Sequence, residues 1–463
     1  MAMNEKQKIA LKYMLDGENV FLTGGAGTGK SYVLKEFLKS KNNVVVCAPT
    51  GIAALNIGGC TLHKLFNIPT DEMRFDSTRK VNEALIAAKT VIIDEISMCS
   101  HDIFDFICQE LYMLSEIPGN SKKQIILSGD FMQLPPISKE KETLFPFQSK
   151  YWDKFNFKCI VLEEVYRQTD IQFVRKLNQV RVGNINALYW IAKKTESNPV
   201  VDSAVVIAAK NSYVNKINFE QIKQIGGRSK CFNAVITGEW QELPIDKKLR
   251  LKIGTRVVAL VNDKNDRYQN GSLGYVKKFM ENGIEVTFDN GTTTIVEPYT
   301  WRNWTYDIGD MQQIIKKEIG KFTQLPLRLA YAITIHKSQG QTFDNLVINP
   351  DCFAEGQLYV AISRAKSLEG IKFSHNPSEK ALIVSPKAKL FYEKLKAVQN
   401  QDNWGGKRNG AGRKRKYRFK TIPIRIGEHT RSIVEKLQIL SIPDLAKIKQ
   451  YINTLEAESE TKK

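Results

Sequence analysis

This 463-residue sequence lacks long hydrophobic runs, paired cysteines and an N-terminal targeting segment. Its apolar stretches all fall short of the roughly 18 residues that a membrane-spanning helix needs. The first ten residues, MAMNEKQKIA, do not have the basic-then-apolar order of a signal peptide. We therefore expect neither a membrane protein nor a cleaved leader.

The cysteines are scattered along the chain and never form a C-x-x-C pair. An odd number of isolated cysteines, seven in all, argues against a zinc site or a disulfide framework. We expect them to be buried thiols of a reducing compartment. They are Cys47, Cys60, Cys99, Cys108, Cys159, Cys231 and Cys352.

What the sequence does have is an excess of basic residues. With 68 Lys and Arg against 49 Asp and Glu, the formal net charge is +19. Such an excess suggests a polyanionic partner, either nucleic acid or an acidic membrane, and does not choose between them. Hydrophobic residues make up 42% of the chain. That is enough for sizeable cores, and the length matches about three domains.

The basic excess is densest near the C-terminus. Residues 401–463 contain 15 basic and 7 acidic residues. Within them, residues 405–420 (GGKRNGAGRKRKYRFK) hold eight basic residues and no acidic one. Because a glycine-spaced run of like charges cannot form a core, we predict a flexible basic arm. A short strand at 421–426 and a helix at 428–440 are predicted to follow it.

Short apolar segments alternate with helical stretches in the first 160 residues. This βαβ spacing predicts a parallel sheet, whose functional residues gather at the carboxyl ends of its strands. The predicted strands are residues 20–23, 44–48, 91–94 and 124–128. A second unit of the same kind is predicted from the segments 204–209, 346–349 and 382–384. The fold class is therefore α/β.

Residues 252–300 have a different pattern. Their apolar segments are closely spaced and separated by Asn-Gly turns. This pattern predicts a small antiparallel β-barrel inserted into the second α/β unit.

The strongest motif is GGAGTGKS at residues 24–31, which lies between an apolar strand and an apolar-periodic helix. Backbone N–H groups of such a loop wrap phosphates. We expect Lys30 to reach the β- and γ-phosphates of ATP and the Ser31 hydroxyl to bind Mg²⁺. A plain glycine-rich turn is the alternative; a dinucleotide fingerprint fails because its last glycine would fall on Lys30. The residues assigned to the nucleotide are Gly25, Ala26, Gly27, Thr28, Gly29, Lys30 and Ser31.

Acidic and amide side chains follow two other predicted strands. Asp94 is expected to hold Mg²⁺ through water, and Glu95 to orient or deprotonate the attacking water. The alternative for this pair is a helix cap. Gln133, in the segment FMQLPP, could contact the γ-phosphate or its water, although spacing alone does not single it out.

The order of these motifs resembles that of PIF-type superfamily 1B DNA helicases and their RecD-like relatives, over most of residues 4–372. The resemblance rests on NEKQ (4–7), the P-loop, APTGIAALNIGGCTLH (48–63), IDEISM (93–98), SGDFMQLPP (128–136), LEEVYRQ (162–168) with RVG (181–183), ITIHKSQGQTFD (333–344) and YVAISRA (359–365).

The resemblance implies two RecA-like domains with ATP in the cleft between them. Gln7 would read the adenine, and Arg167 and Arg364 of the second domain would reach the γ-phosphate when the cleft closes. It also implies an accessory β-barrel of Src-homology type. The domains we assign are 1–160 with a wedge insertion at about 68–88, 161–244 with 311–400, the barrel at 245–310, and the basic extension at 401–463.

A single strand of DNA would lie across both domains, held by hydroxyls, amides and a few basic groups. The residues that match the family's DNA motifs are Thr50, Asn56, Thr61 and His63 in the first domain, and Thr334, His336, Lys337 and Ser338 in the second. Phe75 is a candidate for the tip of the wedge. Arg267, Tyr268 and Lys277 are candidate contacts on the barrel, unless they belong to a solvated face.

The resemblance thus implies an ATP- and Mg²⁺-dependent helicase that moves 5′→3′ on single-stranded DNA and unwinds forked duplex DNA. We expect a monomer, without a membrane partner, in the cytoplasm of a bacterial or phage-infected cell and associated with its nucleoid. Two alternatives stay open. One is a RecD-like translocase or remodeller that seldom unwinds; the other is a P-loop nucleic-acid-binding switch.

Overall fold

The computed structural model describes residues 3–69, 81–117, 122–136, 144–200, 203–240, 242–310 and 313–403. The chain divides into two compact units, residues 1–400 and 401–463. The predicted basic arm at 405–420, the strand at 421–426 and the helix at 428–440 lie outside the described residues, and so does Phe75 of the predicted wedge.

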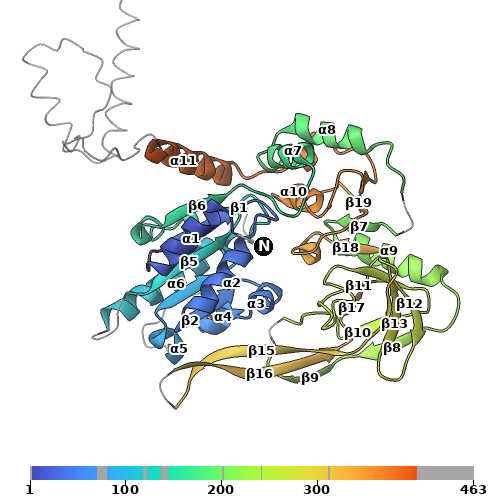
Figure 1. Cartoon of the computed structure of the whole chain (residues 1–463), viewed down its shortest axis with the longest axis horizontal. Helices are drawn as coiled ribbons and strands as arrows, with labels where there is room; N and C mark the ends of the chain where they lie inside the picture. Colours follow the sequence, from blue (N-terminus) through green and yellow to red (C-terminus); the bar gives the residue numbers. More distant parts are fainter. Residues whose placement is uncertain are drawn as a thin grey trace, which may run out of the picture. The chain divides into compact units, whose positions relative to one another are not determined.

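The first unit begins with a parallel six-stranded sheet in the order β3-β2-β4-β5-β1-β6 (Figure 1). All of its neighbouring strands run parallel. The strands are β1 (Val20–Gly24), β2 (Val44–Ala48), β3 (Cys60–Thr61), β4 (Thr90–Ile93), β5 (Gln124–Gly129) and β6 (Lys158–Leu162). The helices are α1 (Glu5–Leu15), α2 (Lys30–Ser40), α3 (Gly51–Ile57), α4 (Leu62–Leu65), α5 (Glu83–Ala87) and α6 (His101–Glu116). Strand β6 was not predicted, and it carries this sheet past the boundary that we set at residue 160.

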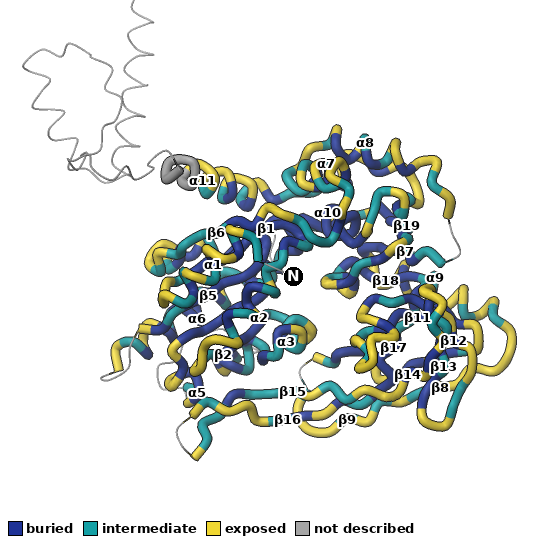
Figure 2. The backbone as a smooth tube through the Cα atoms, viewed as in Figure 1, coloured by how far each residue is buried: buried dark blue, intermediate teal, exposed yellow. Residues whose placement is uncertain are grey.

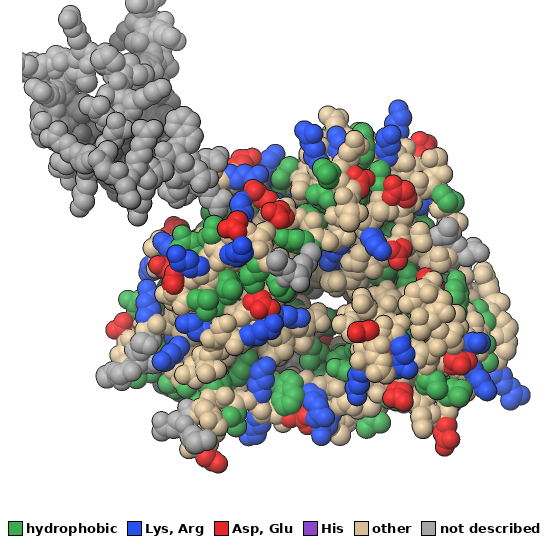
Figure 3. Space-filling view, viewed as in Figure 1, with side chains coloured by type: hydrophobic (Ala, Val, Ile, Leu, Met, Phe, Trp, Pro, Cys, Tyr) green, Lys and Arg blue, Asp and Glu red, His purple; other side chains and the backbone are tan. Residues whose placement is uncertain are grey.

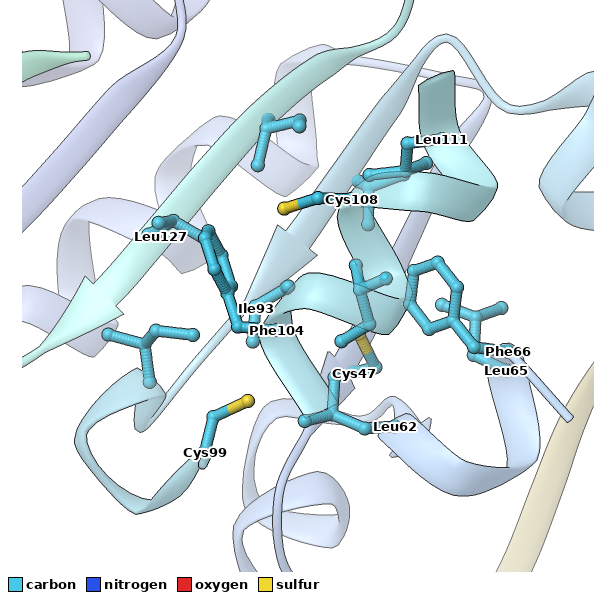
Figure 4. Packing of buried hydrophobic residues seen from close by; sticks show 14 of the residues in the cluster. Cys47, Leu62, Leu65, Phe66, Ile93, Cys99, Phe104, Cys108, Leu111 and Leu127 are labelled. Carbon is cyan, nitrogen blue, oxygen red and sulfur yellow. The ribbon is translucent and has the colours of Figure 1, made fainter. Parts of the chain in front are cut away.

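Both faces of this sheet are buried because successive strand residues point to opposite sides. Val20 and Leu22 pack with α1 and α2 on one face, whereas Phe21 packs with α6 on the other. Figure 4 shows this second face, where Ile93 and Leu127 of the sheet meet helix residues such as Phe104. Continuous apolar strands therefore mark a sheet covered on both sides.

A second parallel sheet has the order β18-β7-β19-β20. Its strands are β7 (Val205–Ala208), β18 (Ala332–Thr334), β19 (Leu346–Ile348) and β20 (Ile371–Phe373). The helices around it are α7 (Ile171–Arg181), α8 (Ile185–Thr195), α9 (Asn211–Gln224) and α10 (Gln357–Ile362). Figure 2 shows most of the strand residues in both parallel sheets as buried, whereas the edge strand β6 is mostly half-buried.

The strand predicted at 382–384 is wrong. Those residues follow a short 3-10 helix and pair with no strand. Instead, the carbonyl oxygen of Ile383 accepts a hydrogen bond from the backbone N–H of Gly356 (3.0 Å). The segment is thus apolar because it packs on the start of α10, and β20 takes the predicted place at the sheet edge.

Antiparallel sheets occupy the middle of the chain, as the turn pattern predicted. The largest has the order β14-β13-β12-β11-β17, and two smaller ones have the orders β15-β16-β9 and β10-β8. Their strands are β8 (Lys230–Asn233), β9 (Val235–Gly238), β10 (Lys248–Leu251), β11 (Arg256–Ala259), β12 (Leu273–Phe279), β13 (Ile284–Phe288), β14 (Thr293–Val296), β15 (Tyr299–Ile308), β16 (Ile314–Gln324) and β17 (Leu327–Leu329). The antiparallel region is therefore larger than the 245–310 that we assigned, since β8 and β9 before this range and β16 and β17 after it also belong to it.

One candidate DNA contact in this region is wrong. Tyr268 is only 6% exposed, and its ring stacks on Phe288 at 4.8 Å. It belongs to the core of the antiparallel sheets. Arg267 beside it forms an exposed ion pair with Asp263 (2.8 Å), and Lys277 is exposed on β12.

Two later segments pack against the first sheet. In the hairpin β15–β16, the hydroxyl of Tyr306 accepts a hydrogen bond from the backbone N–H of Val46 (3.0 Å). The helix α11 (Pro386–Asn403) buries Ala388 and Tyr392 in the same cluster as Phe21. Neither contact was foreseen, because both join residues that are far apart in the chain.

The cysteines agree in part with their prediction. Cys47, Cys60, Cys99 and Cys108 are buried and Cys159 and Cys352 are half-buried, and all seven are free thiols. Cys231 is exposed because it lies on β8, in a sheet of only two strands. Among the described residues, no helix is both long and apolar enough to cross a lipid bilayer.

Candidate nucleotide and DNA sites

The loop at residues 24–31 connects the buried strand β1 to the first turn of α2. Gly29 has the left-handed φ of 85°, and a Cβ there would lie 2.6 Å from the side-chain nitrogen of Gln7. Glycine is therefore required by both the backbone and its neighbour. Ser31 follows on the exposed first turn of α2.

Gln7 lies against this loop. It closes a capping box with Asn4 at the start of α1, which orients its side chain. Its Nε2 donates to the carbonyl oxygen of Thr28 (3.2 Å), and the residue is 2% exposed. The structure thus places the predicted adenine reader at the base of the phosphate loop.

Lys30 points back over the loop. Its Nζ donates to the carbonyl oxygens of Gly24 (2.8 Å) and Gly25 (3.2 Å). Burial lowers the pKa of this lysine, although the carboxylates of Asp130, Glu95 and Asp94 oppose that shift. The ammonium group is therefore surrounded by three acidic side chains at the carboxyl ends of β4 and β5.

The acidic pair follows β4 as predicted. Asp94 is 7% exposed and accepts a hydrogen bond from the backbone N–H of Glu95 (3.0 Å). Glu95 has a φ of 52°, which is uncommon for a residue with a side chain and marks a held conformation. Burial and the neighbouring Asp94 raise the pKa of Glu95 to about 7. A carboxyl group that titrates near neutrality suits a general base.

Gln133 belongs to a buried network that the sequence did not single out. Its Nε2 donates to Asp130 (3.2 Å), which has no exposed surface. Arg181 of α7 donates to the same carboxylate through Nε (3.0 Å) and Nη2 (2.5 Å). The Tyr392 hydroxyl of α11 lies 3.2 Å from Asp130 and 2.5 Å from the hydroxyl of Thr23. The network joins the ends of β1 and β5 to two later helices.

The two predicted arginines lie together on the other side of the loop. Arg167 Nη1 donates to the carbonyl oxygen of Ser363 (3.2 Å), and Arg364 Nη2 donates to the hydroxyl of Ser363 (2.8 Å). Arg364 is 2% exposed, and burial together with Arg167 lowers its pKa to about 9. The charge of Glu95 also acts on Arg364. This arginine is therefore near the predicted base.

Direct contacts join the phosphate loop to these later segments. The backbone N–H of Tyr166 donates to the carbonyl oxygen of Gly27 (2.9 Å), and a Cβ on Gly27 would lie 2.6 Å from that of Arg167. The Tyr359 hydroxyl accepts a hydrogen bond from the backbone N–H of Ala26 (3.0 Å). The loop of the first sheet and the helix before Arg364 therefore meet at one place.

The four first-domain DNA candidates lie around α3 and α4. Thr50 and Thr61 are the N-caps of these helices, and their hydroxyls accept from the backbone N–H groups of Ala53 (3.2 Å) and Lys64 (3.3 Å). Asn56 is exposed. His63 is half-buried, and burial lowers its pKa. The hydroxyls of Thr50 and Thr61 thus cap helices in this structure, whether or not they also contact DNA.

The second-domain candidates form the turn after β18. Thr334 is buried and its hydroxyl accepts from the backbone N–H of Lys337 (3.3 Å). Ser338 has no exposed surface and donates to the carbonyl oxygen of Ile335 (2.7 Å). His336 is half-buried, with a pKa lowered by burial. Lys337 is the member of this set whose charged group is exposed.

The matches to known proteins agree with these motifs. Residues 2–189 match the model of the PIF1-like helicase family, and residues 329–368 match that of the UvrD-like helicase C-terminal domain. The ATP-dependent DNA helicase Pif1 of Campylobacter jejuni is 33% identical over 413 residues, which cover 78% of this chain and 90% of that protein. The chain belongs to the PIF1-like helicase family.

Solved structures of this family share the fold. A crystal structure of Bacteroides sp Pif1 in complex with ADP-AlF4 matches with a TM-score of 0.78 and 35% identity, over 86% of this chain and 98% of that one. The same Bacteroides protein bound to single-stranded DNA matches with a TM-score of 0.60 at the same coverage. The arrangement of the present chain is thus more similar to the former.

Within this family fold, the residues that contact the candidate site and were not predicted from the sequence are of two kinds. Asp130, Arg181 and Tyr359 lie inside quoted motifs, and an acid directly after a buried strand could have drawn attention to Asp130. Tyr392 had no signal, since a tyrosine at helical spacing looks like any core residue.

Proposed function

We propose that this chain moves 5′→3′ along single-stranded DNA and unwinds the forked duplex ahead of it. ATP-hydrolysing DNA helicase activity follows from its family membership. The observation that carries the coupling is the contact of the phosphate loop with segments of the second domain, through Gly27 with Tyr166 and Ala26 with Tyr359. Any movement between the two parallel sheets changes this site.

In the proposed reaction, the loop N–H groups and Lys30 bind the phosphates of ATP. Glu95 accepts a proton from the attacking water, for which its pKa of about 7 is suited. Gln133 orients the water or the γ-phosphate from its place on Asp130. Arg167 and Arg364 turn from Ser363 toward the negative charge that develops in the transition state.

The site also fits Mg²⁺. Magnesium in nucleotide sites takes one or two protein oxygen ligands and several phosphate and water oxygens. The Ser31 hydroxyl and the Asp94 carboxylate are such donors, at the start of α2 and the end of β4. Bound magnesium would neutralise phosphate charge, and Asp94 would hold it through water.

DNA would lie across the α3–α4 region and the turn at Thr334. These two regions would hold the strand in turn as ATP binds and its products leave. In this structure, later segments lie on the α3–α4 region. The backbone N–H of Gly51 donates to the Glu242 carboxylate (2.9 Å), and Lys64 pairs with Glu239 (2.5 Å). These two contacts support a role for Gly51 and Lys64 in binding phosphate oxygens, since both are donors for anions.

The excess of basic residues has a secondary role in the proposed DNA binding. Figure 3 shows Lys and Arg side chains spread over the visible face and mixed with Asp and Glu. We infer that the extension 401–463 adds salt-sensitive affinity, because counterion release scales with the phosphates neutralised. The protein would act as a monomer in the cytoplasm of a bacterial or phage-infected cell, near the nucleoid.

A forked duplex with a 5′ single-stranded tail tests the function. We expect DNA-stimulated ATP hydrolysis and strand separation, and no separation on a fork with only a 3′ tail. Stimulation without separation would favour a RecD-like translocase, and binding without stimulation would favour a nucleic-acid-binding switch. Lys30→Ala should abolish turnover and keep DNA binding, so unwinding by that variant would refute the mechanism.

A further inference from the structure

A cavity of about 520 Å³ lies between α9 and the antiparallel sheets. Its walls come from α9, β10, β17 and the end of β18. It is separate from the phosphate loop, but Thr334 and Lys337 of the proposed DNA turn form one of its walls. Its volume is within the range of ligand-binding pockets.

The lining of this groove is strongly basic. Asp246 is its one acidic residue, and its Oδ1 lies 3.9 Å from Lys337 Nζ. Because this single carboxylate cannot neutralise several cations, the net charge of the groove is positive and attracts anions. The basic residues are Lys223, Lys248, Arg250, Lys252, Arg328 and Lys337.

Arg328 is the decisive residue because its guanidinium is unpaired. Its Nε is completely buried without a hydrogen-bond partner, and no hydrogen bond or ion pair is found for its side chain within the described residues. Burial lowers its pKa, and Asp246 only partly opposes this. Arg328 as a whole is half-buried, and a half-buried cation without a counter-ion favours the binding of an anion.

Arg256 provides a comparison on the neighbouring strand β11. It is equally basic and 1% exposed, but its Nη1 and Nη2 both donate to Asp289 (2.5 Å each). The Nε of Arg256 is also buried without a hydrogen-bond partner, so the two arginines differ in their ion pairs: Arg256 has Asp289, whereas Arg328 has no ion pair among the described residues and faces a cavity. An arginine kept in this state is explained if an anion from outside binds it.

The rest of the groove combines apolar side chains with three asparagines of α9. Phe219 on α9 is 71% exposed, although large aromatic side chains are usually buried. Leu249 and Leu327 form part of the floor. Basic groups next to an exposed aromatic ring are what a single strand of nucleic acid requires, since phosphates need cations and bases need a stacking surface.

We propose that this groove binds single-stranded DNA where the strand leaves the second domain. Arg328 and the neighbouring lysines hold phosphates, and a base stacks on Phe219. The groove continues from Lys337, which favours DNA over an anionic protein as the occupant. This inference rests on the proposed function, because Lys337 must contact DNA for the groove to extend its path.

The test measures the salt dependence of oligothymidylate binding by fluorescence anisotropy. Arg328→Met should reduce the slope of log K against log salt by about 0.7, the value for one phosphate contact of a single strand. Arg328→Met should not lower Tm, since Arg328 has no ion pair within the described residues that the substitution would break. Phe219→Ala should weaken binding roughly tenfold with an unchanged slope.

Arg175→Gln is the matched control, because Arg175 is exposed on α7 outside the groove. It should leave the slope as in the wild type. An unchanged slope in Arg328→Met would overturn the proposal, and so would a lowered Tm, which is the result expected for Arg256→Met. Neither outcome affects strand separation by the wild-type protein, so the proposed function is judged separately.

Discussion

Replacing Arg181 by methionine should destabilise the first sheet more than any exposed substitution. The side chain of Arg181 is 12% exposed and donates twice to Asp130, which is completely buried. Methionine keeps most of the volume but leaves the carboxylate unpaired. Removing one partner of a buried pair costs about 3–5 kcal/mol. At roughly 2–4 °C per kcal/mol, Tm should fall by roughly 6–20 °C.

The pH dependence of this loss distinguishes charge from packing. In the wild type, Arg181 holds the pKa of Asp130 below its usual range despite burial, so the pair stabilises the fold above about pH 4 and loses this contribution in acid. In Arg181→Met, burial is opposed only by weaker influences such as Lys30 and the hydrogen bond from Gln133, so the pKa of Asp130 rises. The free-energy cost of the buried carboxylate without its arginine is then present at pH 8. It decreases as the pH falls, because the carboxyl group takes up a proton.

Thermal melts of the wild type and Arg181→Met at pH 8 and pH 5 measure this effect. The difference in Tm should be smaller at pH 5. The double variant Asp130→Asn with Arg181→Met should recover much of the loss, because neither charge of this pair remains buried. An equal difference at both pH values, without recovery in the double variant, would refute the reasoning and point to lost packing against Tyr392, whose ring lies 4.8 Å from the guanidinium carbon.

Three other predictions concern activity. Glu95→Gln should lower turnover by about 100- to 10,000-fold. The ATPase activity of the wild type should rise through about pH 7, where Glu95 loses its proton, and this rise should be absent in the variant. If the pH–rate profile of the variant still rises there, Glu95 is not the base. Tyr359→Phe removes the acceptor for the backbone N–H of Ala26. Since one hydrogen bond contributes about 0.5–1.5 kcal/mol, kcat/KM for ATP should fall roughly 2- to 10-fold. Kinetics equal to those of the wild type would show that this contact does not affect ATP turnover. Deleting residues 401–463 should weaken DNA binding and reduce its salt slope, with DNA-stimulated ATPase unchanged at saturating DNA; loss of that stimulation would assign the extension to the helicase core.

Predictions from the sequence were most accurate where neighbouring residues determine the structure. The P-loop, its flanking strand and the start of α2 lie where the motif put them, because glycine conformation and helix capping act over a few residues. The strands β1, β2, β4 and β5 were also predicted, since apolar runs between polar turns mark a covered parallel sheet. In contrast, the edge strands β6 and β20 were missed: β6 begins with a lysine and is only partly buried, and β20 has only three residues.

The sequence by itself thus determined the phosphate loop, the acidic pair after β4 and the family to which the chain belongs. Only the tertiary structure decided which charges are paired. Asp130 meets Tyr392 across 262 residues, and Ala26 meets Tyr359 across 333. The same holds for Arg328, whose lack of a partner cannot be seen in a string of letters. Pairing depends on which side chains a folded chain brings within about 3 Å, and burial then sets what each pair or unpaired charge costs.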